Sequence, residues 1–428
     1  MTRTYQIDER KAIAKFRSHL ITDHENIQLA LPLAELAQRL RNGVDHMLLQ
    51  TELELLLLIM NDEVSYLTGE RYRRVREDRS FHRWGRAPGS VIAHGQKLPI
   101  SRPRVRGERE VKLGSYELFR QDEDMRRQVW ERVMRGLSMR SYDPAVRECA
   151  PAFALGKSAV SERFVLASCE RVAELGKRDL SKLRLCALLL DGVEYRDEHF
   201  LVALGIDQTG SKTILGFHQG ASENQQICDS LLDNLASRGL SFQQKWVVVI
   251  DGSRALRASV RKHCGEQVLV QRCQLHKRRN VSEHFADEAQ LDWDQKLANA
   301  YDLEGYQEAT HALAQIHRQL MSVNPSAARS LEEGLEETLT LHRLGVPLEL
   351  RRSLRSTNPI ESAFSRVRAV CHNVKRWRPG NQRERWIGSA LIFAERKFRR
   401  IVGYRALPKL IAILDARKGT SKAFSQVA

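Results

Sequence analysis

The first seventy residues carry apolar side chains at helical spacing. Between Leu31 and about Leu67, apolar residues recur every three or four positions, which places them on one face of an α-helix. This pattern predicts a helical region over residues 1–70, whose apolar face packs in a helical bundle or against a second copy of the chain. The positions that carry the prediction are Leu33, Leu36, Leu40, Leu48, Leu49 and Leu53.

A basic region with a different pattern follows, over residues 71–115. Seven arginines lie between residues 71 and 86, and the short apolar run Val91–Ala93 comes next. From Pro99 to Arg106 arginines alternate with other residues, and this period of two is typical of a β-strand with two different faces. We therefore predict a small β region with an arginine-bearing face. That face carries Arg102, Arg104 and Arg106.

Helical spacing returns between residues 116 and 180, with glycine-containing breaks. The pattern predicts a helix, a short turn at residues 155–158 and a second helix, which Ser158 caps. This order resembles a helix-turn-helix, the motif that places its second helix in the major groove of DNA. Lys157 and Arg163 near the start of that second helix are the candidate DNA-binding residues. Many helical bundles contain such a turn, so packing alone is the alternative.

The central section, residues 181–280, predicts a sheet flanked by helices. The predicted order is strand 185–195, strand 199–206, strand 212–217, helix 223–237 capped by Ser222, strand 246–251, helix 253–262 and strand 267–273. Three antiparallel strands followed by helix, strand, helix and strand is the order of a ribonuclease H-like sheet. We therefore predict an α/β fold with such a core, in which the first and fourth strands are neighbours.

The strand pattern ends before residue 281. Helical spacing predicts an insertion over residues 281–350, followed by a segment, 351–428, that completes the core with a helix bearing Glu361 and ends in a basic tail. Trp293 of the insertion either packs in its core or stacks on an unpaired base. Cations interleaved with aromatic residues make the tail a candidate for phosphate contact. Its candidate DNA-binding residues are Lys375, Arg376 and Trp377.

Composition narrows the class of partner. Lys and Arg number 69 against 53 Asp and Glu, a net charge of +16 that is expected of a protein acting on a polyanion, although ribosomal, membrane-surface and heparin-binding proteins share it. The hydrophobic content of 42% is sufficient for packed cores. Seven scattered cysteines suggest no disulfide framework and favour a cytoplasmic location. No apolar run reaches the roughly 20 residues of a membrane span.

The apolar runs of two predicted strands end on the same dipeptide. These are Asp191-Gly192 and Asp251-Gly252, and a carboxylate at the end of a buried strand is poorly solvated unless a cation meets it. Glu361 projects from the first turn of a predicted helix that Thr357 or Asn358 can cap. Three acids on separate elements suit a two-metal phosphoryl-transfer site, and oxygen ligands suit Mg²⁺ or Mn²⁺.

A series of short segments carries a more specific signal. They are Asp191-Gly192, Gly205–Asp207, Leu215–Phe217, Gly220–Asn224, Asp251-Gly252, Gln271–Asn280, Thr357–Ser362 and Lys375–Trp377. In this order they resemble the Mutator-type transposases of bacterial insertion sequences, which carry a DDE catalytic domain. The likeness extends more weakly to Pro99–Arg106.

The resemblance implies DNA cleavage and strand transfer at the ends of an insertion sequence. It implies Asp191, Asp251 and Glu361 as the catalytic residues and as the ligands of two Mg²⁺ or Mn²⁺ ions per active site. The partners would be double-stranded DNA, as terminal inverted repeats and as target, and at least one further copy of the chain, because two ends must be held together. Lys277 and Arg278 in the Gln271–Asn280 segment join the candidate DNA-binding residues.

Three alternatives remain open on the sequence. The spacing of Cys273 and His276 suits zinc, but structural zinc sites use four ligands, so a motif that shapes the edge of the active site is the competing interpretation. A structure-specific nuclease on the same core would cleave DNA without joining ends. An inactive descendant of a transposase would bind DNA as a regulator and would need no metal.

Overall fold

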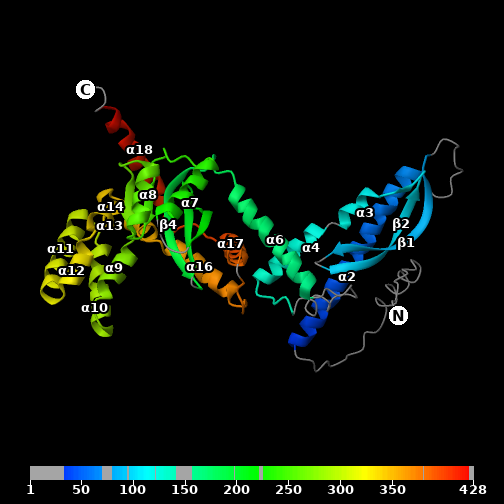
Figure 1. The fold of residues 1–428 in the computed structure, drawn as a ribbon, viewed down its shortest axis with the longest axis horizontal. Helices are drawn as coiled ribbons and strands as arrows, with labels where there is room; N and C mark the ends of the chain where they lie inside the picture. The colour runs from blue at the N-terminus through cyan, green and yellow to red at the C-terminus, as the bar shows by residue number, and fades with distance from the viewer. Residues whose placement is uncertain are drawn as a thin grey trace. The chain divides into compact units, whose positions relative to one another are not determined.

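The computed structural model describes residues 33–69, 80–93, 96–120, 122–140, 157–196, 198–220, 225–378 and 380–423 (Figure 1). The chain divides into two compact units, residues 1–168 and 169–428. The boundary falls inside helix α6 (Lys157–Lys177), whereas the sequence predicted one near residue 180. Three features of the sequence lie outside the described residues. They are the arginines between residues 71 and 79, the start of the turn predicted at 155–158 and the predicted cap Ser222.

A three-stranded antiparallel sheet packed on a long helix forms the core of the first unit. Its elements are α2 (Leu33–Thr68), β1 (His82–Ala93), β2 (Gln96–Arg106), β3 (Glu110–Val111), α3 (Gly114–Phe119) and α4 (Asp122–Met134), with the strands in the order β1-β2-β3. Leu56, Met60 and Val64 recur every fourth residue of α2 and pack against Val91 and Val105 of the sheet. The structure shows one continuous helix in place of several, and its apolar face packs on the sheet of the same unit and not in the predicted helical bundle. Strands β1, β2 and β3 lie within the region predicted to be β.

The second unit is built on a five-stranded mixed sheet. Its strands are β4 (Leu185–Tyr195), β5 (Glu198–Asp207), β6 (Lys212–Gly220), β7 (Val247–Ile250) and β8 (Leu269–Arg272), in the order β6-β5-β4-β7-β8. Strands β4, β5 and β6 are antiparallel, whereas β7 and β8 run parallel to β4. Each predicted strand is present, and its ends differ from the prediction by at most three residues. The predicted α/β class is therefore confirmed.

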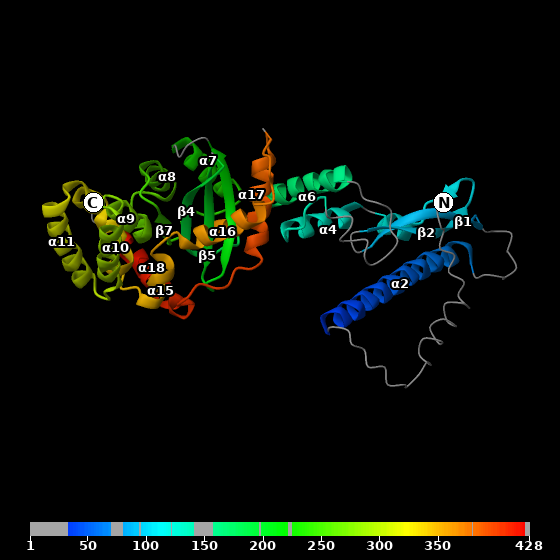
Figure 2. The same ribbon diagram turned by 90° about the horizontal axis from the view of Figure 1, so that it is seen from below.

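Helices cover both faces of this sheet (Figures 1 and 2). Helices α7 (Gln225–Ser237) and α8 (Arg254–Cys264) pack with Leu188 and Leu190 of β4 into one apolar core. Since successive strand residues face opposite ways, Asp191 lies on the other face, where α16 packs on β4.

Two C-terminal helices form that second layer. They are α16 (Asn358–Cys371) and α17 (Gln382–Glu395). Gly388 allows α17 to approach β6 closely, because a Cβ at this position would lie 2.7 Å from the Phe217 ring. Because α16 packs against α17, the close approach of α17 to β6 also positions α16 relative to the sheet.

The segment between β8 and α16 is helical, as predicted. It contains α9 (Gln274–Ser282), α10 (Asp287–Asp302), α11 (Tyr306–Val323), α12 (Pro325–Glu332), α13 (Leu335–Thr338), α14 (Thr340–Arg343) and α15 (Leu348–Leu354). Trp293 is 7% exposed and stacks on Phe285 with ring centroids 5.4 Å apart. The core interpretation of Trp293 is therefore confirmed, since its ring face is already covered.

The chain continues beyond α17 through the short helix η1 (Tyr404–Ala406) into α18 (Leu407–Ala423). Within the described ranges, no helix combines the length and the apolar character that a membrane crossing requires. The finer division of the chain into six regions remains a prediction.

Candidate active site

Asp191 is fixed in the interior of the second unit by strand β4. It pairs with Val202 of β5 and is 2% exposed. Burial raises the pKa of its carboxyl well above the usual range; the His276 charge opposes this rise, the Asp251 charge adds to it, and a hydrogen bond with Thr357 also opposes it. A buried carboxylate of this kind ionises readily only where a cation compensates for the lost water.

Asp251 lies beside Asp191 because of the strand register. Strands β4 and β7 are parallel and Leu189 is opposite Val249, so each aspartate comes two residues after a paired position. The Oδ1 atom of Asp251 accepts a hydrogen bond of 2.8 Å from the Ser253 backbone N–H, which fixes the turn into α8. Backbone geometry thus holds both aspartates two residues beyond a paired position of neighbouring strands, Asp191 within β4 and Asp251 directly after β7.

Glu361 comes from the first turn of α16, where Pro359 also lies, as the sequence predicted. Its Oε1 atom is 3.1 Å from Nη1 of Arg279 and 3.4 Å from Nε2 of His276, and both of these residues belong to α9. Asp191, His276 and Glu361 each offer a side-chain oxygen or nitrogen, and these atoms lie within 4.8 Å of one another. The fold thus brings together two acids that are far apart in the sequence, with an imidazole between them.

Cys273 and His276 form a hydrogen-bonded pair at the start of α9. The Cys273 Sγ caps the helix by accepting from the His276 backbone N–H at 3.5 Å, and the Thr357 hydroxyl donates to the same sulfur at 3.7 Å. A hydrogen bond with Cys273 raises the pKa of His276 to about 9, although burial opposes the rise. Burial alone would raise the pKa of Cys273, but its interactions with His276 lower it overall.

The described residues contain no group that joins this pair to further cysteine or histidine ligands. They therefore do not supply the four ligands of a structural zinc site. The interpretation that remains is the second one, a motif at the edge of the acidic site. The sequence alone did not predict that His276 and Arg279 accompany Glu361. A signal was available, because residues three apart on a helix share a face.

Two candidate DNA-binding residues are engaged inside the protein. Lys277 is 1% exposed, and its Nζ donates to the carbonyls of Ser330 and Glu333 at the end of α12. Arg278 binds the Asp294 carboxylate of α10 through its Nε and Nη2 atoms. The prediction for Lys277 is wrong, because the face of α9 that carries it packs against α12. Arg278 has an internal partner that DNA would have to displace.

The remaining candidates of the second unit differ in exposure. Lys375 and Arg376 are exposed after the end of α16. Trp377 packs edge-on against Tyr195 and Trp386, with ring centroids 5.8 and 6.4 Å away. The two cations are therefore accessible to a phosphate backbone, whereas Trp377 supports the fold around them.

At the predicted helix-turn-helix, α6 already includes Lys157, so Ser158 lies within its first turn. Lys157 is exposed, and the Arg163 side chain donates to the Ala159 carbonyl on the same helix at 3.3 Å. Because part of the preceding turn lies outside the described residues, the helix-turn-helix remains a prediction.

The arginine face of the first unit consists of Arg102, Arg104 and Arg106 on β2, together with Trp84 and Glu110. The Glu110 carboxylate accepts from Arg102 at 3.1 Å and from Arg104 at 2.7 and 2.8 Å. The guanidinium groups of Arg104 and Arg106 lie 4.1 and 4.2 Å from the centre of the Trp84 ring. The predicted alternation is thus correct, but one acid neutralises part of the face.

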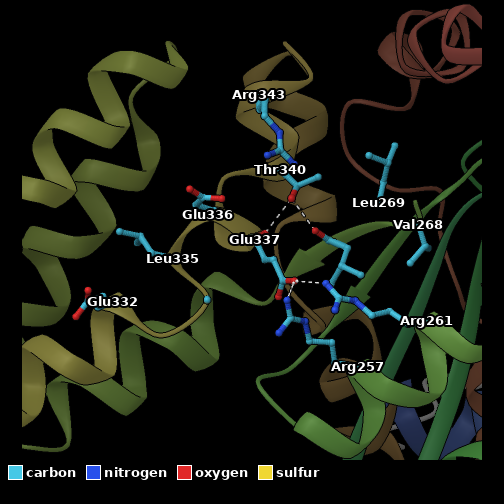
Figure 3. Close-up of a pocket in the computed structure, with 12 residues that line it drawn as sticks. Arg257, Arg261, Val268, Leu269, Glu332, Leu335, Glu336, Glu337, Thr340 and Arg343 are labelled. Atoms are coloured by element: carbon cyan, nitrogen blue, oxygen red, sulfur yellow. Dashed lines mark hydrogen bonds and ion pairs between the residues drawn. The ribbon is translucent and has the colours of Figure 1, made fainter. Parts of the chain in front are cut away.

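A cavity of about 640 Å³ lies elsewhere, between α8, β8 and the helices of the insertion (Figure 3). Arg257 and Arg261 point into it toward Glu337, at 2.5 and 3.9 Å. These two arginines are therefore paired with an acid of the same cavity, and none of the three predicted acids lines it. The candidate active site is the carboxylate cluster and not this cavity.

Comparison with known proteins is consistent with such a site. The family described as "Transposase, Mutator family" matches residues 24–394. The chain is 26% identical to the transposase for insertion sequence element ISRM5 of Rhizobium meliloti (strain 1021) over 336 residues, which cover 75% of this chain and 80% of that protein. It is 25% identical over 364 residues to the transposase for insertion sequence element IS256 in transposon Tn4001 of Staphylococcus aureus, covering 80% and 90%. Because the family match spans most of its length, the chain belongs to the Mutator family of transposases.

Proposed function

We propose that this protein is a DDE transposase, which cleaves DNA at the ends of an insertion sequence and joins the exposed 3′-hydroxyl to target DNA. The observation that carries the proposal is the meeting of Asp191 and Glu361 beside His276, within 4.8 Å. Asp251 at the end of the neighbouring strand would complete the acidic set.

The arrangement of the sheet supports a ribonuclease H-like core. Its order β6-β5-β4-β7-β8, with three antiparallel strands and two further parallel ones, is the order expected for that fold. The positions of Asp191 within β4 and of Asp251 directly after the adjacent strand β7 agree with it. We infer that the helices between β8 and α16 form an insertion into this core, and that the first unit contributes DNA-binding elements.

The donor set fits a divalent metal. Carboxylate oxygens are the ligands that Mg²⁺ and Mn²⁺ prefer, and the buried Asp191 carboxylate lacks enough water to ionise readily by itself. Asp191, Asp251 and Glu361 would hold two ions, whose charge would stabilise the attacking and leaving oxygens of an in-line displacement.

The chain's own residues give this site its rigidity. Strand register fixes Asp191, and the Ser253 N–H orients Asp251. Helix α16 fixes the Glu361 backbone, and His276 and Arg279 hold its carboxylate. Sites on strands and helices position reacting groups more accurately than sites on loops.

We infer two surfaces for double-stranded DNA, the arginine face of β2 and the exposed Lys375 and Arg376. Terminal repeats and target DNA would be the partners, and at least a homodimer would hold two ends. These surfaces supply cations for phosphate contact, while the acidic site carries the chemistry.

A strand-transfer assay with end-labelled terminal DNA tests the proposal. We expect joined products in Mg²⁺ or Mn²⁺, binding without efficient cleavage in Ca²⁺, and no products in excess chelator. Cleavage without joined products would favour a structure-specific nuclease. Binding of terminal DNA without either product, in every metal, would favour a regulator.

A further inference from the structure

Helix α9 places a permanent cation on Glu361, one of the proposed metal ligands. Nη1 of Arg279 lies 3.1 Å from Oε1 of Glu361, and Nε2 of His276 lies 3.4 Å from the same oxygen. A guanidinium does not lose its proton in proteins, so the charge of Arg279 is present at every working pH. The chain thus supplies its own counter-ion where a divalent ion is expected.

The neighbouring arginine shows that this contact is specific. Arg278 is adjacent in sequence, but it points away from the site and binds Asp294. The Arg279 side chain is 49% exposed, whereas that of Arg278 is 20% exposed. Arg279 is therefore the one of the two that can both reach Glu361 and meet a ligand arriving from solvent.

We propose that Arg279 exchanges partners during the reaction: it pairs with Glu361 in the metal-free site and contacts a DNA phosphate once a divalent ion engages Glu361. This inference rests on the proposed function, because it requires Glu361 to be a metal ligand. In the first half of the exchange, the divalent ion and Arg279 compete for the Glu361 carboxylate, and Arg279 is released. The second half follows because a released guanidinium beside the site matches the geometry of a phosphate group.

The exchange also affects the electrostatic repulsion between the site and the DNA phosphate. Ionised carboxylates at the site repel an approaching phosphodiester as long as no cation accompanies them. Arg279 offsets that repulsion in the metal-free protein. After metal binding the ion offsets it, and Arg279 is free to hold the substrate.

The first half is tested by Mn²⁺ affinity, measured by calorimetry on the full chain without DNA. An exposed ion pair typically contributes 0.2–1 kcal/mol, so Arg279→Gln should tighten Mn²⁺ binding about 1.4- to fivefold. Arg278→Gln is the matched control and should leave the affinity unchanged. In a Glu361→Gln background, Arg279→Gln should have no further effect, because the contested carboxylate is gone.

The possible failures are distinguishable. If Glu361→Gln weakens Mn²⁺ binding but Arg279→Gln leaves it unchanged or acts equally in both backgrounds, the exchange is overturned and the proposed metal site stands. If Glu361→Gln has no effect on Mn²⁺ binding, the assignment of Glu361 itself fails, and the exchange fails with it.

The second half is tested by the salt dependence of terminal DNA binding, in Ca²⁺ and in chelator. In Ca²⁺, Arg279→Gln should make the slope of log affinity against log salt shallower by about 0.9, the loss of one phosphate contact, and Arg279→Lys should restore it. In chelator the variant and the wild-type slopes should agree. Equal slopes in Ca²⁺ would overturn the phosphate contact, and thermal unfolding of each variant verifies that it is folded.

Discussion

The carboxylate site of the second unit and the arginine face of the first unit carry opposite charges but are organised alike. In each, a charged side chain that could bind an external ligand forms an ion pair with another residue of the chain. Glu361 pairs with Arg279, and Arg104 pairs with Glu110. They differ in burial. Asp191 at the carboxylate site is 2% exposed, whereas the side chain of Glu110 is 32% exposed.

Because of this difference in burial, the pKa values of the two carboxyl groups shift in opposite directions. Burial raises the pKa of Asp191 well above its usual range although His276 is near. The hydrogen bond from Arg104 lowers the pKa of Glu110 to about 2, because this bond and the charges of Arg104 and Arg102 together outweigh the opposing effect of burial. An acid in the interior thus depends on an arriving cation, whereas an acid at the surface is satisfied by a side chain. Substitutions in the two regions should therefore differ in size.

The largest effect is expected from the three acids. Asp191→Ala, Asp251→Ala or Glu361→Ala should lower the cleavage rate by at least about 10²-fold and leave terminal DNA binding largely intact, because the ligand set is lost but the DNA surfaces are not. Glu349→Ala is the matched control, since Glu349 is an exposed acid upstream of Glu361. Near-normal cleavage by any one of the three variants would remove that residue from the site.

A comparison of Lys277 with Lys375 distinguishes the role of a buried cation from that of a surface cation. Lys277→Met should lower the free energy of unfolding by about 2 kcal/mol, because the carbonyls of Ser330 and Glu333 lose their buried donor. Lys375→Met should leave the unfolding transition in urea unchanged and weaken DNA binding instead. Equal stability of the two variants would contradict the interior role of Lys277.

His342 shows what burial does where no opposite charge is available. It is 3% exposed, its Nε2 lies 3.1 Å from the Tyr301 carbonyl, and burial followed by the Arg351 charge lowers its pKa to about 4. Between about pH 6.5 and 4 the unfolded chain binds a proton that the folded chain does not, so stability falls as pH falls through this range. The loss should be on the order of 1 kcal/mol after solvent screening.

Urea unfolding of the wild type and of His342→Gln, at pH 7 and pH 4.5, measures this loss. Gln keeps a donor for the Tyr301 carbonyl but does not titrate. The same acid-induced loss in both proteins would show that other groups cause it.

The smallest effect is expected at the arginine face. Glu110→Gln should free Arg102 and Arg104, tighten DNA binding and make its salt dependence steeper, with little change in melting temperature. Replacing Arg102, Arg104 and Arg106 together by Gln should make the salt dependence shallower, by up to about three contacts. If neither variant changes the slope, DNA does not contact this face.

Local patterns were sufficient to predict the elements of the fold. The apolar run before Asp191, the period of two along 99–106 and the helical spacing before residue 67 indicate which side chains are removed from water, and these patterns depend only on neighbours in sequence. The same local logic identified Asp191 and Asp251, because an apolar strand that ends on a carboxylate is conspicuous in sequence alone.

Three consecutive residues show what only the tertiary structure decided. Lys277, Arg278 and Arg279 form one basic run in the sequence, yet the first is buried against α12, the second binds Asp294, and the third binds Glu361. Successive helix positions differ by about 100°, so each points to a different neighbour, and those neighbours come from distant parts of the chain. The sequence determined the strands, the helices and the acids, whereas the packing of α9 against α10 and α12, with Glu361 of α16 beside it, determined which cation lies next to the acidic site.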